Sequence, residues 1–557
     1  MKRHLILCAS LFIIAFISGC EHEQLRAEPI YTSQSEKVNA DNIKAHLNFL
    51  ADDTLRGRDT GSQGYQIAAN YVTSYFKQLG LQPMGEETGF EQKINFRQTV
   101  LLDNSAQMII HSAKEPLPLI FKDDFLMSGS SSLTTSYVQA ATVFVGYGVI
   151  ADEFGYNDYK DIDVKDKIVV VLTGRPDDLP FEEGAHIASM REKFTNASKR
   201  GAVGLITIHT PKREKVKTFE SSSIFAGTPH LTWITKQGLP FDSSAQIQVS
   251  AYLSHSKAGS LFQGAERSID EIFLDDINNI AIKGFPLHAK VTMSNKSRHS
   301  NITSPNVIAA IEGSDPQLKD EYVVFSAHLD HIGLSEAHQG GGTANDVINN
   351  GALDNASGVS ILLETARLLS EMTIAPKRSV LFVVVTAEEK GLLGSSYFTN
   401  NPTVPLQRMV ANVNLDMPLI LYPFADVIAF GSTHSSLENI VKRAAQKVNI
   451  ALSPDPMPEQ ALFTRSDHYN FVKAGIPSVF LMTGFNSTDP DVDGGKVFND
   501  FFKNHYHQHS DQIDLPIRYD AAAKFAEVNM MIGLEIANSR HRPTWNKDDF
   551  FGQLFAI

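Results

Sequence analysis

Two nearly continuous apolar runs, at residues 322–327 and 380–386, most constrain the fold of this 557-residue chain. Neither run alternates apolar and polar residues, as is typical of strands that are covered on both faces of a parallel sheet. We therefore expect two buried strands of an α/β protein. Between them, the spacing of apolar residues from about Gly358 to Met372 predicts a helix.

Residue types that bind metals follow each run directly. His328 and Asp330 follow the first run, and Glu388 and Glu389 follow the second. Asp354 lies between them, in a loop rich in Gly, Asn and Ser. In an open α/β sheet, ligands bind at the carboxyl ends of the strands. Two adjacent carboxylates are usually a solvated pair, but behind a buried strand they are costly to desolvate, and a bound metal would offset that cost.

Two further segments extend this set of candidate ligands. A third apolar run, at 409–415, ends in Asp416, and the later segment NHYHQHSD contains Tyr506 and His507. Two histidines and three carboxylates suit a pair of zinc ions that each need about four nitrogen or oxygen ligands, with one position left for water. One carboxylate must then bridge the two metals.

The segments HLD, GALDNASG, EE, NLD and YH occur in this order, and together they resemble the M28 family of dizinc aminopeptidases and carboxypeptidases. The resemblance covers roughly the last half of the chain and part of the N-terminal portion. It implies two Zn²⁺ ions per chain, with one ion bound by His328 and Asp416 and the other by Glu389 and His507. It also implies that Asp354 bridges the ions and that the Asp354–Asn355 peptide bond is cis.

The same resemblance implies three catalytic roles. Glu388 would be the general base that takes a proton from water and passes it to the leaving amine. Asp330 would orient His328 through its second ring nitrogen, and Tyr506 would donate a hydrogen bond to the developing oxyanion. Successive residues of a strand point to opposite faces. We therefore expect Glu388 and Glu389 to reach different partners if the extended conformation continues to the end of the strand.

Several polar residues near these motifs have an open role. Arg56 and Arg58, in a loop before the helix expected at 66–79, could be substrate anchors, but ordinary loop charges are the preferred interpretation. Asp467 and His468 follow Ser466 directly, and either a supporting or a substrate-binding role is open for them. A Ser/His/Asp hydrolase site is disfavoured, because the three residues are contiguous and no GxSxG motif is present there.

The first residues resemble a bacterial lipoprotein signal. Lys2 and Arg3 precede an apolar stretch at 5–17, which is too short to span a membrane, and small residues then lead to Cys20. The resemblance implies a signal peptide at 1–19, a lipid anchor on Cys20, and an exported lipoprotein, with Glu21 favouring the outer membrane, facing the periplasm or the cell surface. The alternative is an ordinary secretory signal.

The cysteine content and the net charge argue against a disulfide-stabilised protein and against a nucleic-acid-binding protein. Cys8 and Cys20 are the only cysteines, so removal of the signal would leave no intramolecular disulfide. The net charge of −14 argues against nucleic acid as a partner, because binding to it requires clustered basic residues.

Changes in composition along the chain divide it into segments. After a polar tether at 20–38, the N-terminal part of a peptidase domain is expected at 39–124, and the metal-binding peptidase domain at 289–557. Between them, short β-rich runs at 141–149, 167–174 and 203–209 resemble a protease-associated (PA) domain, expected at 125–288. The fold class is therefore α/β, with a mixed, largely parallel sheet flanked by helices and an inserted β-rich PA domain. The resemblance implies that this domain limits which peptides reach the metals.

These observations favour a dizinc aminopeptidase that hydrolyses N-terminal residues of peptides outside the cytoplasm. Because the same metal core serves other members of the family, a carboxypeptidase or dipeptidase is the alternative enzyme. A catalytically inactive, lipid-anchored binding protein is the alternative from another class. Loss of metal ligands would be its signature, and none of the expected ligands is missing.

Overall fold

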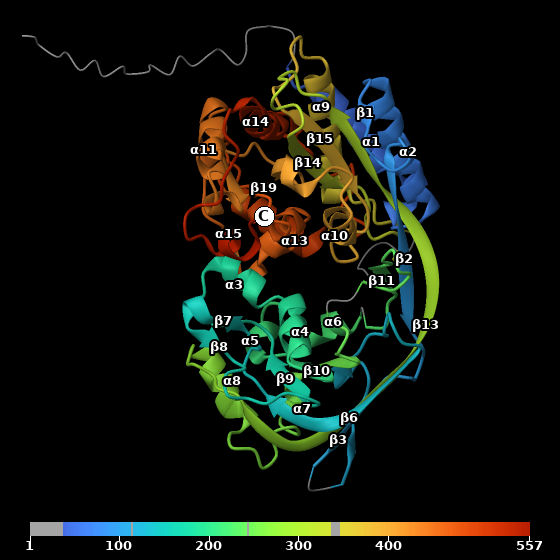
Figure 1. The fold of residues 1–557 in the computed structure, drawn as a ribbon, viewed down its shortest axis with the longest axis vertical. Coiled ribbons are helices and arrows are strands. Elements are labelled where there is room, and N and C mark those ends of the chain that lie inside the picture. Colours follow the sequence, from blue (N-terminus) through green and yellow to red (C-terminus); the bar gives the residue numbers. More distant parts are fainter. Residues whose placement is uncertain (1–36, 113–114, 225, 242–243, 336–345) are drawn as a thin grey trace, which may run out of the picture. The chain divides into compact units, whose positions relative to one another are not determined.

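The computed structural model describes residues 37–112, 115–224, 226–241, 244–335 and 346–557. The expected signal peptide at 1–19 and nearly all of the tether at 20–38, including Cys8 and Cys20, lie outside the described residues. The segment Val38–Ile557 forms one unit that contains two sheets (Figure 1). Among the described residues, no helix combines the length and the apolar character needed to cross a bilayer.

The three apolar runs form the centre of the first sheet. They are β14 (Tyr322–His328), β15 (Ser379–Val385) and β16 (Met409–Asn414). β14 lies between β15 and β16 and is parallel to both, and β19 (Ser478–Thr483) continues the parallel set beside β16. The outer strands of this sheet are β1 (Gln82–Pro83), β2 (Glu91–Leu101), β11 (His230–Trp233), β13 (Phe285–Ile311), β17 (Asp426–Phe430) and β18 (Ala451–Leu452). The expectation of a mixed, largely parallel sheet is confirmed.

Helices cover both faces of this sheet, which explains why its strands show no alternation. Val323 and Phe325 of β14 belong to one hydrophobic core, whereas Val324 belongs to a second core on the opposite face. The helices of the larger core include α1 (Ala40–Leu50), α2 (Gln63–Gln78), α9 (Gly358–Ser370), α11 (Leu437–Lys447) and α14 (Tyr519–Asn538). The smaller core contains residues of α10 (Leu393–Asn400) and α12 (His468–Lys473). The helices α13 (Gly494–Asn504) and α15 (Phe550–Phe555) complete the C-terminal half.

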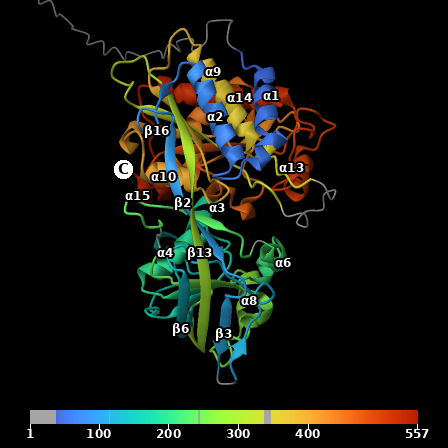
Figure 2. The same cartoon turned by 90° about the vertical axis from the view of Figure 1, so that its right-hand side faces the viewer.

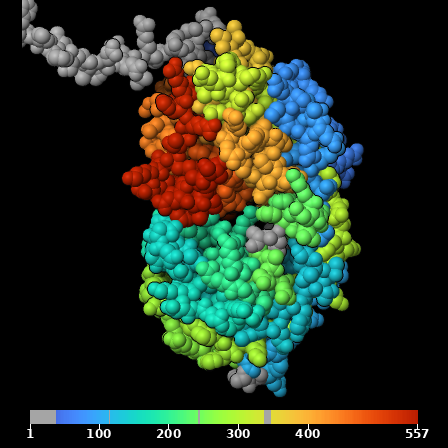
Figure 3. Space-filling model, in the orientation of Figure 1, coloured from blue at the N-terminus to red at the C-terminus, as the bar shows by residue number. Residues whose placement is uncertain are grey.

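The N-terminal helices pack against elements that lie far along the sequence. α1 contacts α9 and α14, and α2 contacts β13. Figure 3 shows the same arrangement at the surface, where the blue N-terminal residues lie beside yellow and orange residues of the peptidase part. The helices α1 and α2 therefore pack with elements of the C-terminal half of the chain.

The second sheet also has parallel strands at its centre. β6 (Thr135–Phe144), β9 (Ile168–Leu172), β10 (Gly204–Ile208) and β12 (Val249–Leu253) are parallel and lie side by side in that order. Antiparallel strands complete the sheet: β3 (Gln107–His111), β4 (Leu117–Pro118), β5 (Phe125–Leu126) and β13. Its helices are α3 (Phe181–Ile187), α4 (Met190–Lys199), α5 (Pro211–Glu214), α6 (Phe219–Ser223), α7 (His255–Ala258) and α8 (Ile269–Ile277). The small hairpin of β7 (Ile150–Ala151) and β8 (Tyr156–Asn157) lies nearby in the sequence.

One strand belongs to both sheets. β13 runs for 27 residues, pairing with β3 and β6 in its first half and with β2 and β15 in its second half (Figure 2). The core of the second sheet extends from Met108 to Met293, so it begins before residue 125. The expected boundary between residues 288 and 289 falls within β13. The composition of the sequence changes there, but the strand continues without a break.

Candidate metal centre

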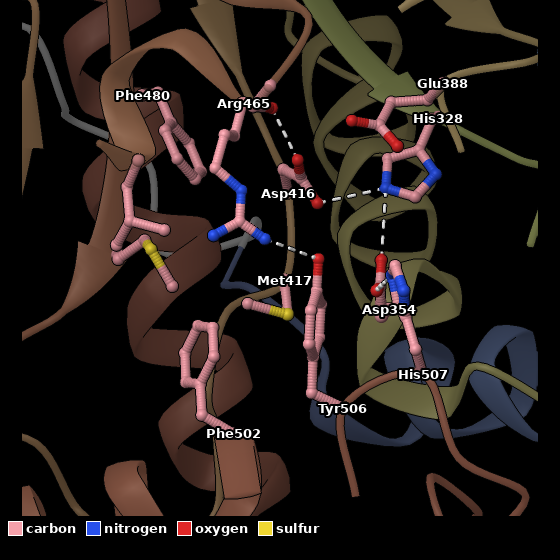
Figure 4. Close-up of a pocket in the computed structure, with 13 residues that line it drawn as sticks. His328, Asp354, Glu388, Asp416, Met417, Arg465, Phe480, Phe502, Tyr506 and His507 are labelled. Atoms are coloured by element: carbon pink, nitrogen blue, oxygen red, sulfur yellow. Dashed lines mark hydrogen bonds and ion pairs between the residues drawn. The ribbon is translucent and has the colours of Figure 1, made fainter. Parts of the chain in front are cut away.

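The carboxyl edge of the first sheet brings the predicted ligands together. β14 ends at His328, and Asp416 follows two residues after β16. The Nε2 atom of His328 lies 3.0 Å from Oδ1 of Asp416 and 3.3 Å from Oδ1 of Asp354 (Figure 4). All three side chains are buried, and their spacing suits a single metal ion.

A second group of ligands shares Asp354. The Nε2 atom of His507 lies 3.2 Å from Oδ2 of Asp354 and 3.0 Å from Oε2 of Glu389. Nitrogen and oxygen ligands about 2.0–2.2 Å from one zinc ion are separated by roughly 3.3 Å when the geometry is tetrahedral. Since the two oxygens of Asp354 face different groups, the donor set fits two metal ions with Asp354 between them.

The electrostatics of the site also favour bound cations. Burial alone would lower the pKa of His507, but Glu389 and Asp354 raise it to about 10. The pKa of His328 is likewise held above its ordinary range, because Asp416 and Glu388 outweigh the effect of burial. Several carboxylates taken out of water are costly unless positive charge compensates them, which zinc ions would supply.

Backbone contacts hold Asp354 in place. Both oxygens of the buried Asp511 carboxylate accept backbone N–H groups, from Leu353 at 2.9 Å and from Asp354 at 3.0 Å. The side-chain amide of Asn355 donates to the carbonyl of Leu415, one residue before the ligand Asp416. The Asp354–Asn355 peptide bond is cis, which confirms the expectation.

Asp330 faces the second ring nitrogen of His328 through its main chain rather than through its side chain. The Nδ1 atom of His328 faces the backbone carbonyl of Asp330, 3.1 Å away, and not its carboxylate. The carboxylate instead accepts the backbone N–H groups of Glu388 at 3.1 Å and Glu389 at 3.3 Å, and the hydroxyl of Thr60 at 3.2 Å. Asp330 therefore orients His328 through its main chain and fixes the turn that carries the glutamate pair through its side chain.

The two glutamates do not obey the alternation of a strand. β15 ends at Val385, and Ala387 has a φ of 55°, so the chain has left the extended conformation before Glu388. Both carboxylates consequently face the metal-ligand groups, although with different neighbours. Glu389 contacts His507, whereas Glu388 lines the pocket together with His328 and Asp416.

The surroundings of Glu388 raise its affinity for a proton. Desolvation raises the pKa of Glu388 well above its ordinary range, and the neighbouring charge of Glu389 adds to this effect, although His328 opposes it. A carboxylate with a raised pKa can accept and return a proton more readily than an exposed one.

His331 belongs to the site, and the sequence reasoning missed it. Its buried Nδ1 atom lies 2.7 Å from Oε1 of Glu389, and its ring lies 5.7 Å from that of His507. The Nε2 atom of His331 has no hydrogen-bond partner among the described residues. His331, Asp354 and Glu389 form another group with spacing suitable for a metal. The sequence could have indicated His331 as a candidate, because it lies three residues after His328, just beyond the end of β14.

A pocket opens beside these ligands. Its empty space, part of which is open to solvent, is about 390 Å³. One wall contains the ligands and Glu388, and the opposite wall is mostly apolar. The apolar residues that line the pocket are Met417, Leu462, Phe480, Met482 and Phe502.

Tyr506 and Arg465 complete the pocket. The ring of Tyr506 stacks on that of His507, with 3.9 Å between the centroids. The Tyr506 hydroxyl accepts a hydrogen bond from Nη2 of Arg465 at 3.1 Å (Figure 4). Tyr506 thus lies where the resemblance expected it, whereas Arg465 was not anticipated.

Three residues with an open role lie outside the pocket. Arg58 is buried and donates hydrogen bonds to the carbonyls of Leu329, Asn350 and Gly351, so it supports the two loops that carry His328 and Asp354. Asp467 and His468 are buried and do not line the pocket. The structure therefore favours supporting roles for all three.

The first sheet and its edge define an α/β protein with a paired metal-binding site. The sequence pattern of Peptidase family M28 matches residues 306–532, a segment that contains all five predicted metal ligands. This part of the chain is therefore similar to Peptidase family M28.

Similar proteins with established names include several peptidases. Aminopeptidase NAALADL1 of Mus musculus is 36% identical over 139 residues, which are 24% of this chain and 16% of that protein. Aminopeptidase YwaD of Bacillus subtilis is 29% identical over 202 residues, covering 35% of this chain and 38% of that protein. The Glutamate carboxypeptidase 2 homolog of Caenorhabditis elegans is 21% identical over 581 residues, covering 91% of this chain and 69% of that protein. The chain thus spans about a sixth of the mouse relative.

Among solved structures, an aminopeptidase from Aneurinibacillus sp. strain AM-1 is similar with a TM-score of 0.49 and 18% identity. The similarity covers 89% of this chain and 93% of that chain.

Proposed function

We propose that this chain is a zinc-dependent aminopeptidase that hydrolyses the N-terminal residues of peptides. The observation that carries the proposal is the position of Asp354, whose two oxygens face two separate groups of candidate ligands. Glu388 lines the pocket beside these groups. The names of the similar aminopeptidases support the same activity.

The ligand set assigns the metals to this edge of the sheet. His328 and Asp416 would hold one zinc ion, Glu389 and His507 would hold the other, and Asp354 would bridge the two. Bound there, zinc would polarise the scissile carbonyl group and bring the pKa of a water molecule towards neutrality.

The remaining chemistry belongs to side chains of the pocket. The carboxylate of Glu388 would accept a proton from the attacking water and return it to the amine that leaves. The hydroxyl of Tyr506 would donate a hydrogen bond to the oxygen of the scissile carbonyl as negative charge develops there. Because Arg465 donates to the Tyr506 oxygen, the hydroxyl hydrogen stays available for this contact.

The lining of the pocket indicates which side chains it would accept. Its Met, Leu and Phe side chains would remove an apolar side chain from water. We therefore expect large apolar N-terminal residues to be accepted.

A direct test compares peptides that differ only at their N-terminus. Zinc-loaded protein should hydrolyse leucine p-nitroanilide and lose this activity on dialysis against a chelator, with recovery on addition of zinc. N-acetyl-leucine p-nitroanilide should not be cleaved. Metal analysis should give two zinc ions per chain, and a single tightly bound ion with full activity would contradict the dinuclear assignment.

A carboxypeptidase or dipeptidase is the second candidate, favoured by Arg465 in the pocket. A guanidinium group suits a terminal carboxylate, and one similarity that covers 91% of this chain is to a Glutamate carboxypeptidase 2 homolog. Cleavage of an N-acylated peptide with a free C-terminal carboxylate, without cleavage of the leucine anilide, would replace the aminopeptidase proposal with this one.

The second sheet is proposed to be the PA domain and to limit which peptides reach the pocket. Its helix α3 supports this role, because it contacts the short helix Leu462–Thr464, directly before the pocket residue Arg465. The Nδ1 atom of His186 in α3 also lies 2.5 Å from the hydroxyl of Tyr469 in the peptidase part.

Lipid anchoring on Cys20 and an exported location are proposed from the N-terminal sequence. The test is a Cys20→Ser variant in a bacterial host. Loss of membrane association would support the anchor, and unchanged processing and membrane binding would favour an ordinary secretory signal.

A further inference from the structure

Arg465 has an unusual position for an arginine. Among the described residues that line the pocket, it is the only lysine or arginine. Its side chain lies between Phe480 and Tyr506 and extends towards the centre of the pocket (Figure 4). The residue is exposed, so its position is not imposed by a buried partner.

The guanidinium group has spare capacity to bind an anion. Its one hydrogen bond within the described chain goes to the hydroxyl of Tyr506, and its carbon lies 5.9 Å from the centre of that ring. No carboxylate in the described part of the chain forms an ion pair with Arg465. Arginine carries five N–H donors in a planar fork that matches a carboxylate, so most of its donors are available to a ligand.

Other cations lie close to Arg465 from the second sheet. Burial lowers the pKa of Lys217, and the positive charges of Arg213 and Arg465 lower it further. The charges of Arg213 and Arg465 therefore both act on Lys217. A ligand that carries negative charge would relieve this repulsion, whereas a cationic ligand would increase it.

We propose that Arg465 binds a carboxylate of the peptide substrate and that the enzyme prefers substrates with a carboxylate close to the scissile bond. This inference rests on the proposed peptidase function and adds the substrate class to it. The carboxylate has two possible sources. One is the side chain of an N-terminal Asp or Glu residue, and the other is the terminal carboxylate of a dipeptide.

A purely structural role of Arg465 would have a different effect on the kinetics of its variants. If Arg465 served only to orient Tyr506, its loss would lower the turnover of every substrate by the same factor. If it binds a substrate carboxylate, its loss lowers the rate for carboxylate substrates alone or to a much greater extent. The ratio of kcat/KM between matched substrates therefore separates the two roles.

The experiment uses two pairs of nearly isosteric substrates with zinc-loaded full-length protein. Glutamate p-nitroanilide and glutamine p-nitroanilide differ only in a side-chain carboxylate. Leu-Gly and Leu-Gly-amide differ only in a terminal carboxylate. Each pair is assayed with the wild type, Arg465→Gln, Arg465→Lys, and the control variant Arg518→Gln, which replaces an exposed arginine that pairs with Asp520.

The wild type should prefer the carboxylate member of one pair by about 10- to 100-fold, the range for a hydrogen bond to a charged group. Arg465→Gln should bring this ratio close to one, Arg465→Lys should retain part of it, and Arg518→Gln should leave it unchanged. A preference in the first pair assigns the side-chain carboxylate, and a preference in the second assigns the terminal carboxylate. An absent preference in both pairs, or a preference that persists in Arg465→Gln, overturns the proposal.

Calorimetric titration of the same pairs into zinc-loaded Glu388→Gln protein, alone and combined with Arg465→Gln, measures binding without turnover. Absence of hydrolysis by the wild type would reject the proposed function, and the binding ratios would still decide the role of Arg465. Equal binding of both members of each pair would then reject the role of Arg465 independently.

Discussion

The two sheets of this protein are built from the same kind of strand but differ at one edge. β14, β15 and β16 of the first sheet and β9, β10 and β12 of the second are parallel, and most of their residues are buried. In the first sheet, His328, Glu388 and Asp416 come at or just after the carboxyl ends. In the second sheet, the corresponding positions are Thr173, His209 and Ser254.

The polar groups of the second edge satisfy one another. The backbone N–H of Thr210 donates to the hydroxyl of Thr173 at 3.1 Å, and His209 is held between Tyr252 and Glu214. Of the residues that the structure describes, none at this edge forms a group spaced for a metal ion. The apolar runs thus determine where the strands lie, and the few residues beyond them determine whether an edge can hold metals.

The largest effect is expected from a substitution at the carboxyl edge of the first sheet, which should abolish the proposed catalysis without changing the second sheet. Glu388→Gln keeps the size of the side chain but removes the base, so kcat should fall about 10²- to 10⁴-fold. Both zinc ions should remain, as measured by metal analysis. His209→Gln, at the equivalent edge of the second sheet, should change kcat less than twofold. Loss of a metal in Glu388→Gln would assign this residue as a ligand instead.

The next effect tests the contact between the two regions. His434 of the peptidase part lies 2.7 Å from Glu182 of α3 and 2.7 Å from Asp549. Burial lowers the pKa of His434, but hydrogen bonds with Asp549 and Glu182 outweigh this and raise it to about 10. His434→Gln should therefore lower the free energy of unfolding by about 3 kcal/mol at pH 6, the lower part of the range for breaking a buried ion pair.

The sign of the pH dependence follows from the raised pKa. The stabilisation by protonated His434 is complete below pH 6.5 and is lost as the pH rises through about 10. Urea unfolding at pH 6 and pH 10 should therefore show a smaller difference between wild type and variant at the higher pH. Glu183→Gln, next to Glu182, is the control and should have little effect. An equal difference at both pH values would show that His434 acts by packing alone.

A smaller effect tests how the first edge is held together. Asp330→Asn can accept only one of the two backbone N–H groups of the Glu388–Glu389 turn, so zinc affinity should fall about 10- to 100-fold, as for other residues that support metal ligands. Competition with a chromogenic chelator measures this. The exposed Asp320→Asn is the matched control. Unchanged affinity would show that the turn does not depend on Asp330.

The smallest effect concerns His331. His331→Asn removes the contact with Glu389 at the second ligand group, so the zinc site of Glu389 and His507 should lose affinity by about tenfold, while the site of His328 and Asp416 should be unaffected. His505→Asn, a nearby residue whose Nδ1 faces Ser510, is the control. Complete loss of one zinc ion would make His331 a direct ligand.

Much of the fold could be predicted because buried strands require apolar residues, which are recognisable in the sequence. The runs that became β14, β15 and β16 were found within one or two residues, since strands covered on both faces must be apolar throughout. β13 was not anticipated as one strand, because its middle portion, around Asn295 to Thr303, is polar and reads as a connection. Some of its pairing partners lie more than 200 residues away, and no local pattern reveals them.

The site was predictable only in its ligand types. His328, Asp354, Glu389, Asp416 and His507 are recognisable because they occur in a fixed order beside strands. Whether the carboxylate or the carbonyl of Asp330 faces His328 depends on a few torsion angles, which the sequence does not encode locally. His331 and Arg465 are ordinary loop residues until the fold brings Glu389 and Tyr506 to them, 58 and 41 residues along the chain.

The continuity of β13 restricts how this protein could be altered. At about 3.4 Å per residue, its 27 residues give a contour length of roughly 90 Å. A deletion of one residue near its centre would turn every following side chain to the other face, so at least one sheet would have to give up its register. Removal of the second sheet by recombination could begin in the connection between β2 and β3, but it would have to cut through β13 at its other limit. The second sheet is therefore joined to the framework of the peptidase sheet, and evolution or protein engineering could exchange it only by replacing part of β13.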